Sequence, residues 1–192
     1  MGEIVGNPKI KGVIVLARRQ FVLDRWGPEG WQQVLARLPP ADQEMLGQLL
    51  LHVNWYPFDL GQRLDEAIAS VHSPNDRRGI FLEMGRASAE VNLSQAHRAY
   101  VRPGDPHFLL SCMPQIYKAY YDTGHRTYAK VGPTSAVLRT YDAENVTSED
   151  CLTVVGWLEQ AVAICGGQAV QVREPCCRVT GAPYCEYVIE WQ

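Results

Sequence analysis

The stretch Arg173-Glu-Pro-Cys-Cys-Arg-Val-Thr-Gly-Ala-Pro-Tyr-Cys185 holds three of the six cysteines of this 192-residue chain. Segments 168–173 and 184–191 flank it and alternate between apolar and polar residues, which predicts two antiparallel strands. The glycine and proline between them indicate a turn. A hairpin of this kind brings Cys177 and Cys185 within reach of one ion, with Glu174 at the end of the incoming strand. The stretch therefore predicts a sheet with metal ligands at one end.

A fourth ligand is available from Cys151, at the start of a helix predicted from about 149 to 164. The free N–H groups of a helix N-terminus favour a thiolate. Three thiolates and one carboxylate suit zinc, and four protein ligands close the shell of a structural ion. Cys176 competes with Cys177, but neighbours in an extended segment point in opposite directions, and the spacing favours Cys177. The alternative is that these cysteines are small buried hydrophobes.

The rest of the chain is predominantly helical by its apolar spacing. The pattern predicts a strand at 10–16, helices at 18–26, 28–38, from 40 onward, 58–71, 77–100 and 106–121, and a hairpin of strands 126–131 and 135–141. Small residues around Gly85 predict close helix packing. We expect an α+β fold, with helices packed on a small antiparallel sheet of about four to five strands. Residues 1–8 are expected to be a flexible N-terminus, and 9–192 a single domain.

The composition is that of an ordinary globular protein, with 46% hydrophobic and 20% charged residues. A net charge of −3 argues against a nucleic-acid partner, for which a basic face is expected. No run approaches the apolar length of a membrane span, and the N-terminus lacks a signal-peptide pattern. The sequence therefore favours a cytoplasmic protein.

The four predicted ligands, with the Gly166-Gly167 turn between them, resemble the zinc site of the 4-vinyl-reductase domain. That domain is the sensor of aromatic-responsive bacterial transcription activators. The specific match covers about the last 42 residues. The whole chain is similar to stand-alone myxobacterial proteins of unknown function, which share the landmarks Ile10-Lys11-Gly12, Trp55-Tyr56-Pro57 and Glu190-Trp191.

The resemblance implies the fold of the haem nitric-oxide-binding domain and of the Golgi-tethering TRAPP subunits. These proteins pack helices on an antiparallel sheet, and several enclose an apolar pocket. The resemblance further implies a structural zinc ion, a ligand bound elsewhere, and a homodimer.

An apolar pocket is predicted between the helices 77–100 and 106–121, where it would accept a hydrophobic or aromatic small molecule. The alternative is that the same side chains pack against one another as core. The residues assigned to this pocket are Met84, Phe108, Cys112, Ile116, Tyr117 and Tyr120.

The functional hypothesis is a sensor or regulatory module that acts through a partner signalling protein. An adaptor with a filled core and an apolar surface near Trp26, Trp31 and Trp55 is the alternative. A haem-binding gas sensor would need an axial histidine, for which His97 and His107 are candidates, but the Tyr-x-Ser-x-Arg haem clamp is absent. No nucleophile, phosphate-loop or zinc-protease motif is present, so no catalytic residue and no enzymatic activity are expected.

Overall fold

The computed structural model describes residues 7–143 and 146–192, so the predicted flexible segment 1–8 lies, up to residue 6, outside the described residues. The helices are α1 (Gly12–Leu35), α2 (Pro40–Gly47), α3 (Phe58–His72), α4 (Arg77–Ser94), α5 (Pro106–Tyr120) and α6 (Ser148–Ile164), with short 3₁₀ turns at Arg98–Tyr100 and Arg178–Thr180. The strands are β1 (Lys9–Lys11), β2 (Trp55–Pro57), β3 (His125–Gly132), β4 (Ser135–Tyr141), β5 (Gln171–Cys176) and β6 (Tyr184–Glu190).

The helix starts that frame the functional site are fixed by side-chain caps. Asp76 accepts from the Gly79 amide at the start of α4, and Asp105 accepts from the Phe108 amide at the start of α5. Thr147 caps α6, where it forms a reciprocal capping box with Asp150. The last cap anchors the helix that carries Cys151 in its first turn.

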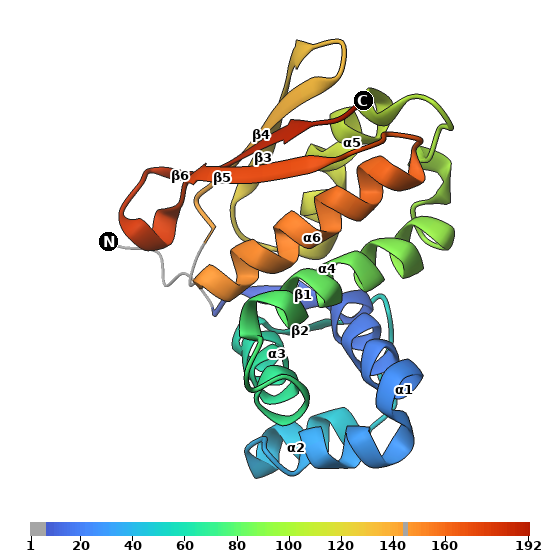
Figure 1. The fold of residues 1–192 in the computed structure, drawn as a ribbon. Helices are drawn as coiled ribbons and strands as arrows, with labels where there is room; N and C mark the ends of the chain where they lie inside the picture. Colours follow the sequence, from blue (N-terminus) through green and yellow to red (C-terminus); the bar gives the residue numbers. More distant parts are fainter. Residues whose placement is uncertain (1–6, 144–145) are drawn as a thin grey trace.

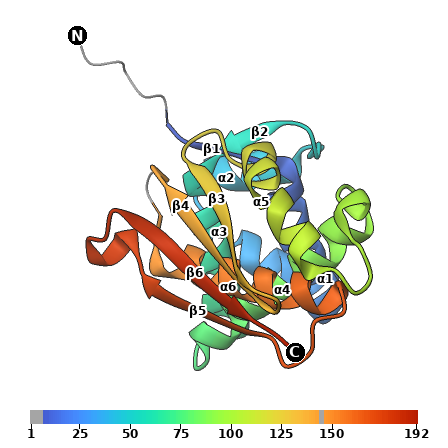
Figure 2. The ribbon, with the colours of Figure 1, turned by 90° about the horizontal axis from the view of Figure 1, so that it is seen from above.

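The main sheet has the order β3-β4-β6-β5, and every neighbouring pair is antiparallel. In Figure 1, α6 lies between this sheet and α4, while α1, α2 and α3 form a helical layer beyond α4. Figure 2 shows α5 lying beside the β3 edge. This arrangement confirms the predicted α+β fold with helices on a small antiparallel sheet.

One face of the main sheet is buried against the helices, and its other face is open. The buried side chains alternate along the strands, as a one-sided sheet requires. They are Arg126, Ala136, Leu138, Thr140, Cys185, Tyr187 and Ile189. Arg126, Thr140 and Cys185 thus occupy the same face on three adjacent strands, because Arg126 pairs with Thr140 and Thr140 with Cys185.

The prediction of a strand over 10–16 is wrong beyond residue 11. The strand β1 is three residues long and pairs with β2, and the helix α1 begins at Gly12. The β-branched run favours a strand locally. The buried Val15, Arg18 and Val22, however, lie at helical spacing, and packing against α3 and α4 overrides local propensity.

The break predicted at Gly27 is a kink, since α1 continues across it. Gly27 has a φ of +66°, and Pro28 restarts the helix in the next turn.

None of the helices in the described part of the chain combines the length and apolar character that crossing a bilayer requires.

The helices α4 and α6 cross with their backbones in contact. A Cβ atom added to Gly85 would overlap the carbonyl oxygen of Thr153, and one added to Gly156 would overlap that of Leu82. The close packing predicted around Gly85 is therefore present, and Gly156 is its counterpart on α6.

We expect Gly156→Ala to destabilise the protein by about 1–3 kcal/mol, because the helices must separate to admit one methyl group. Urea unfolding of this variant beside Gly47→Ala measures the effect, since nothing lies within 4 Å of a Cβ at Gly47. Equal stability of the two variants would contradict the described helix contact.

Candidate metal centre and interior cavities

Four potential metal ligands converge where α6 meets the sheet. Cys151 lies in the first turn of α6, Glu174 on β5, Cys177 directly after β5, and Cys185 near the start of β6. Their ligand atoms all lie within 4.8 Å of one another. We call these four residues the cysteine–glutamate cluster. The structure thus brings together all four residues that the sequence assigned to the metal.

The spacing of the sulfur atoms matches a tetrahedral zinc centre. The Sγ of Cys151 lies 3.6 Å from that of Cys177 and 3.9 Å from that of Cys185. A tetrahedral zinc ion with Zn–S bonds of about 2.3 Å holds its sulfurs about 3.8 Å apart, whereas a disulfide needs about 2.05 Å. Glu174 completes the set, because its Oε1 is buried and has no hydrogen-bond partner among the described residues. The residues present therefore fit zinc.

The electrostatics of the cluster distinguish its thiols. A hydrogen bond from Cys151 lowers the pKa of Cys185 to about 7, and the amide of Arg178 also donates to this sulfur over 3.4 Å. The same bond to Cys185, together with burial, raises the pKa of Cys151. Burial raises the pKa of Cys177 as well. Cys185 is therefore the thiol that ionises first, and a bound cation would favour the thiolate form of the others.

The remaining cysteines lie outside the cluster. Cys176 precedes Cys177 on the extended strand β5 and is not among the clustered ligand atoms. Cys165 is fully buried at the C-terminal end of α6, and Cys112 is half-buried on α5. These three thiols provide natural control positions for experiments on the metal.

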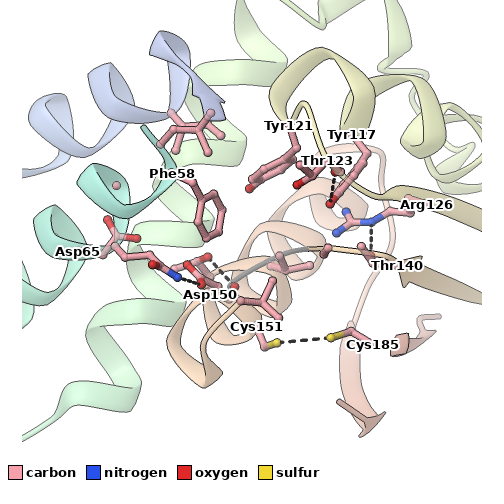
Figure 3. A pocket seen from close by; sticks show the side chains of 18 of the residues that line it. Phe58, Asp65, Tyr117, Tyr121, Thr123, Arg126, Thr140, Asp150, Cys151 and Cys185 are labelled. Carbon is pink, nitrogen blue, oxygen red and sulfur yellow. Dashed lines mark hydrogen bonds between the residues drawn. The ribbon is translucent and has the colours of Figure 1, made fainter. Parts of the chain in front are cut away.

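An interior cavity adjoins the cluster, between α1, α3 and α6 on one side and the sheet on the other. Figure 3 shows Phe58, Asp65, Tyr121 and Arg126 arranged around this space, with Cys151 and Cys185 at its floor. We call it the sheet-side cavity. Its walls also include Ile10, Ile14, Val15, Leu64, Tyr117, Thr140 and Val154.

A second cavity, the helix-side cavity, lies between α4, α5 and α6. Gly85, Ser88, Asn92, Met113, Ile116, Tyr120 and Trp157 line it, and it shares Ile14, Arg18, Tyr117, Tyr121, Arg126, Thr153 and Val154 with the sheet-side cavity. Each cavity measures about 60 Å³. Pockets for drug-sized ligands measure about 300–1,000 Å³. A larger ligand would have to displace the shared wall and join the two cavities.

Two buried arginines face these cavities. Arg18 is neutralised, because its Nε and Nη2 donate to the two carboxylate oxygens of Asp65 over 2.6 and 3.1 Å, and its Nη1 donates to Ser88. Arg126 is only 8% exposed, and its Nε donates to Thr140 Oγ1 over 2.9 Å. No carboxylate forms an ion pair with Arg126 among the described residues.

Only three of the six residues that the sequence assigned to a pocket line one of the interior cavities. Ile116, Tyr117 and Tyr120 line the helix-side cavity. Met84, Phe108 and Cys112 do not line either interior cavity. Met84 is packed in the core of the N-terminal helices, and Phe108 lies beneath the guanidinium of Arg102.

Sequence reasoning missed the charged wall of the cavities. Arg18, Asp65 and Arg126 come from three distant elements, and charged residues are usually exposed. One signal for burial exists at Arg126. It lies two residues before Tyr128 on β3, so strand alternation places both side chains on the face that points to the helices.

None of the five histidines, all of which lie in the described part of the chain, lines either interior cavity. His107 uses both ring nitrogens, Nδ1 with the Tyr128 hydroxyl and Nε2 with the Gly132 carbonyl. His97 has a buried Nε2 that finds no hydrogen-bond partner among the described residues, and burial lowers its pKa, but the side chain lines an outer groove. The described residues around the two interior cavities therefore offer the iron of a haem no axial histidine.

A family model described as "Protein of unknown function (DUF2378)" matches residues 45–192, and the chain therefore belongs to this family. No curated protein matches the chain.

Among solved structures, the fold is similar to an H-NOX protein from S. oneidensis in the Fe(II)NO ligation state, with a TM-score of 0.74 and 17% identity over 95% of this chain and 99% of that one. It is also similar to an unliganded Fe(II) H-NOX protein from K. algicida, with a TM-score of 0.67 and 11% identity over 95% and 96% of the two chains. At these identities the likeness establishes a shared fold.

Proposed function

We propose that this member of the DUF2378 family is a non-enzymatic, ligand-binding regulatory domain held together by a structural zinc ion. The observation that carries the proposal is the pair of adjoining cavities between the helices and the sheet, with Cys151 and Cys185 of the cysteine–glutamate cluster at the floor of the sheet-side cavity. The fold that the chain shares with H-NOX proteins supports a sensor.

The zinc ion would act as a structural clamp in this proposal. Its four protein ligands would tie the start of α6 to β5 and β6, and thereby fix two walls of the sheet-side cavity. A catalytic zinc ion keeps one position for water or substrate, and a shell of four protein ligands leaves none. The spacing of the ligands supports a zinc site like that of the 4-vinyl-reductase domain.

The ligand in this proposal is a small apolar or aromatic molecule, because aliphatic and aromatic side chains form most of the cavity walls. Residues 9–192 would form a single domain that passes the bound state to a partner signalling protein or to a second copy of the chain. Leu49, Leu51, Val53 and Trp55 expose between 40% and 84% of their surface and offer an apolar contact segment.

A thermal-shift screen of small aromatic and aliphatic compounds tests the proposal. A ligand present at about 100 times its Kd stabilises the folded chain by about 2.7 kcal/mol, which raises the melting temperature by roughly 5–10 °C. Val154→Trp should abolish the shift, because Val154 borders both cavities. Val137→Trp, on the open face of β4, should retain it.

The two alternative functions, an adaptor and a haem sensor, predict different results in the same screen. An adaptor with a filled core would bind none of the compounds. Of the three tryptophans assigned to its surface, Trp31 is buried, Trp26 stacks on His72, and only Trp55 is exposed. A haem sensor is favoured by the H-NOX-like fold and would instead give a Soret band on titration with hemin. The absence of a histidine from the interior cavities speaks against it.

A further inference from the structure

The guanidinium of Arg126 is buried, and it forms no ion pair with any described side chain. Its Nε donates a hydrogen bond to Thr140. Its Cζ lies 5.0 Å from the ring centroid of Tyr117 and 5.7 Å from that of Tyr187. Figure 3 shows the guanidinium pointing into the sheet-side cavity between Tyr117 and Thr140. Its two terminal nitrogens make no hydrogen bond with the described residues. A buried charge without a partner is costly, so this position favours an external counter-ion.

Two acidic side chains, Asp65 and Asp150, line the sheet-side cavity with Arg126, and neither forms an ion pair with it. Both carboxylate oxygens of Asp65 accept from Arg18. Asp150 accepts from the amide of Thr147 and from the side chain of Gln62. Cys185 lies across the strand from Thr140, yet Arg126 donates no hydrogen bond to any described sulfur. Among the described residues, the cavity therefore contains one arginine that is paired with a carboxylate, Arg18, and one that forms no ion pair, Arg126.

We infer that the ligand of the interior cavities is an apolar or aromatic carboxylic acid, whose carboxylate pairs with Arg126. This inference rests on the proposed function and names the chemical class of its ligand. With Nε occupied, the two terminal nitrogens of Arg126 form a planar fork that matches the two oxygens of a carboxylate.

The rest of the cavity fits the other end of such a molecule. Ile14, Phe58 and Val154 provide an apolar wall, and the rings of Tyr117 and Tyr121 stack on each other with centroids 4.8 Å apart. An aromatic acid would place its ring against these side chains while its carboxylate reaches Arg126. The amide of the same acid has equal size and lacks only the charge.

Isothermal titration of the full chain with phenylacetate, benzoate and their two amides tests the inference. The acids should bind about 10- to 100-fold more tightly than the amides, which is the range expected for hydrogen bonds to a charged group. Arg126→Gln should remove this preference. Arg173→Gln should preserve it, because Arg173 is an exposed arginine on the same sheet that pairs with Glu190.

Equal affinity for acids and amides in the wild-type chain would overturn the inference. If, in that case, Val154→Trp abolished the binding of both acids and amides, the proposed ligand-binding function would stand, and only the inferred contact between a carboxylate and Arg126 would be wrong. The melting temperature of Arg126→Met gives a second, ligand-free readout. A higher value than that of the wild type supports an unbalanced cation, even if none of the four probes binds. A lower value, with no probe bound, means that the charge is balanced within the protein and overturns the inference.

A parallel titration with hemin separates two sources of the carboxylate. If the small acids do not bind, and hemin gives a Soret change that Arg126→Gln abolishes, the group that binds Arg126 is a haem propionate. Binding of the small acids without a Soret change identifies a free carboxylic acid.

Discussion

Replacing Cys185 by serine is expected to remove the metal and to destabilise the protein by more than about 4 kcal/mol. Metal binding at a structural site is part of the folding free energy, and apparent values for zinc in small domains reach about 10–16 kcal/mol. This chain has two apolar cores of its own, so we expect partial rather than complete unfolding of the variant population. At about 2–4 °C per kcal/mol, the melting temperature should fall by roughly 10 °C or more.

Cys176→Ser is the matched control, because Cys176 is adjacent to Cys177 in the sequence but its sulfur is not among the clustered ligand atoms. It should retain the metal and melt within about 2 °C of the wild type, as expected for a change of at most about 0.5 kcal/mol. Metal content and melting temperature measured on both variants decide the matter. Loss of metal from Cys176→Ser with retention in Cys185→Ser would show that the assignment of ligands is wrong.

Replacing Arg18 by methionine is expected to cost about 3–5 kcal/mol, because it leaves the carboxylate of Asp65 buried without its partner. Both side chains are nearly inaccessible, at 7% and 11% exposure, and they form two hydrogen bonds. The double variant Arg18→Met/Asp65→Leu should recover most of the loss, since it removes both charges together. Guanidinium unfolding of the two variants measures the difference.

Arg25→Met provides the surface comparison for this ion pair. Arg25 lies on the same helix and pairs with Glu83, but both side chains are more than 40% exposed. Such exposed pairs contribute about 0–1 kcal/mol. A loss of equal size in Arg18→Met and Arg25→Met would contradict the view that burial makes the Arg18 pair essential to the cavity wall.

The sequence was most informative where the chemistry is local. Cys177 and Cys185 flank one short connection between two alternating segments, so hairpin geometry alone brings them together. Glu174 and Cys151 follow from the neighbouring strand and helix start. Their convergence within 4.8 Å agrees with the ligand set predicted from the sequence. The fold class was also predictable, because helical spacing in the first two thirds of the chain gives way to strand alternation.

The cavities were less predictable because their walls come from contacts between distant elements. Arg126, Arg18 and Asp65 lie on β3, α1 and α3, and a local signal, the alternation of the strand, exists only for Arg126. Prediction of the pocket followed the aromatic residues of α5 and therefore included Phe108. That side chain lies beneath Arg102 instead. The same limitation explains the error at 10–16, where tertiary packing turned a β-branched run into the first turns of α1.

The central claim is that the cysteine–glutamate cluster binds a structural zinc ion beside a ligand-binding cavity. Native mass spectrometry of the full chain purified without chelator, followed by a denaturing spectrum of the same sample, tests it most directly. We expect one zinc ion per folded chain, which is lost on denaturation, and any further organic mass should be that of a carboxylic acid. A well-folded chain that carries no metal would show that the cysteine–glutamate cluster is no zinc site and that these cysteines are core residues.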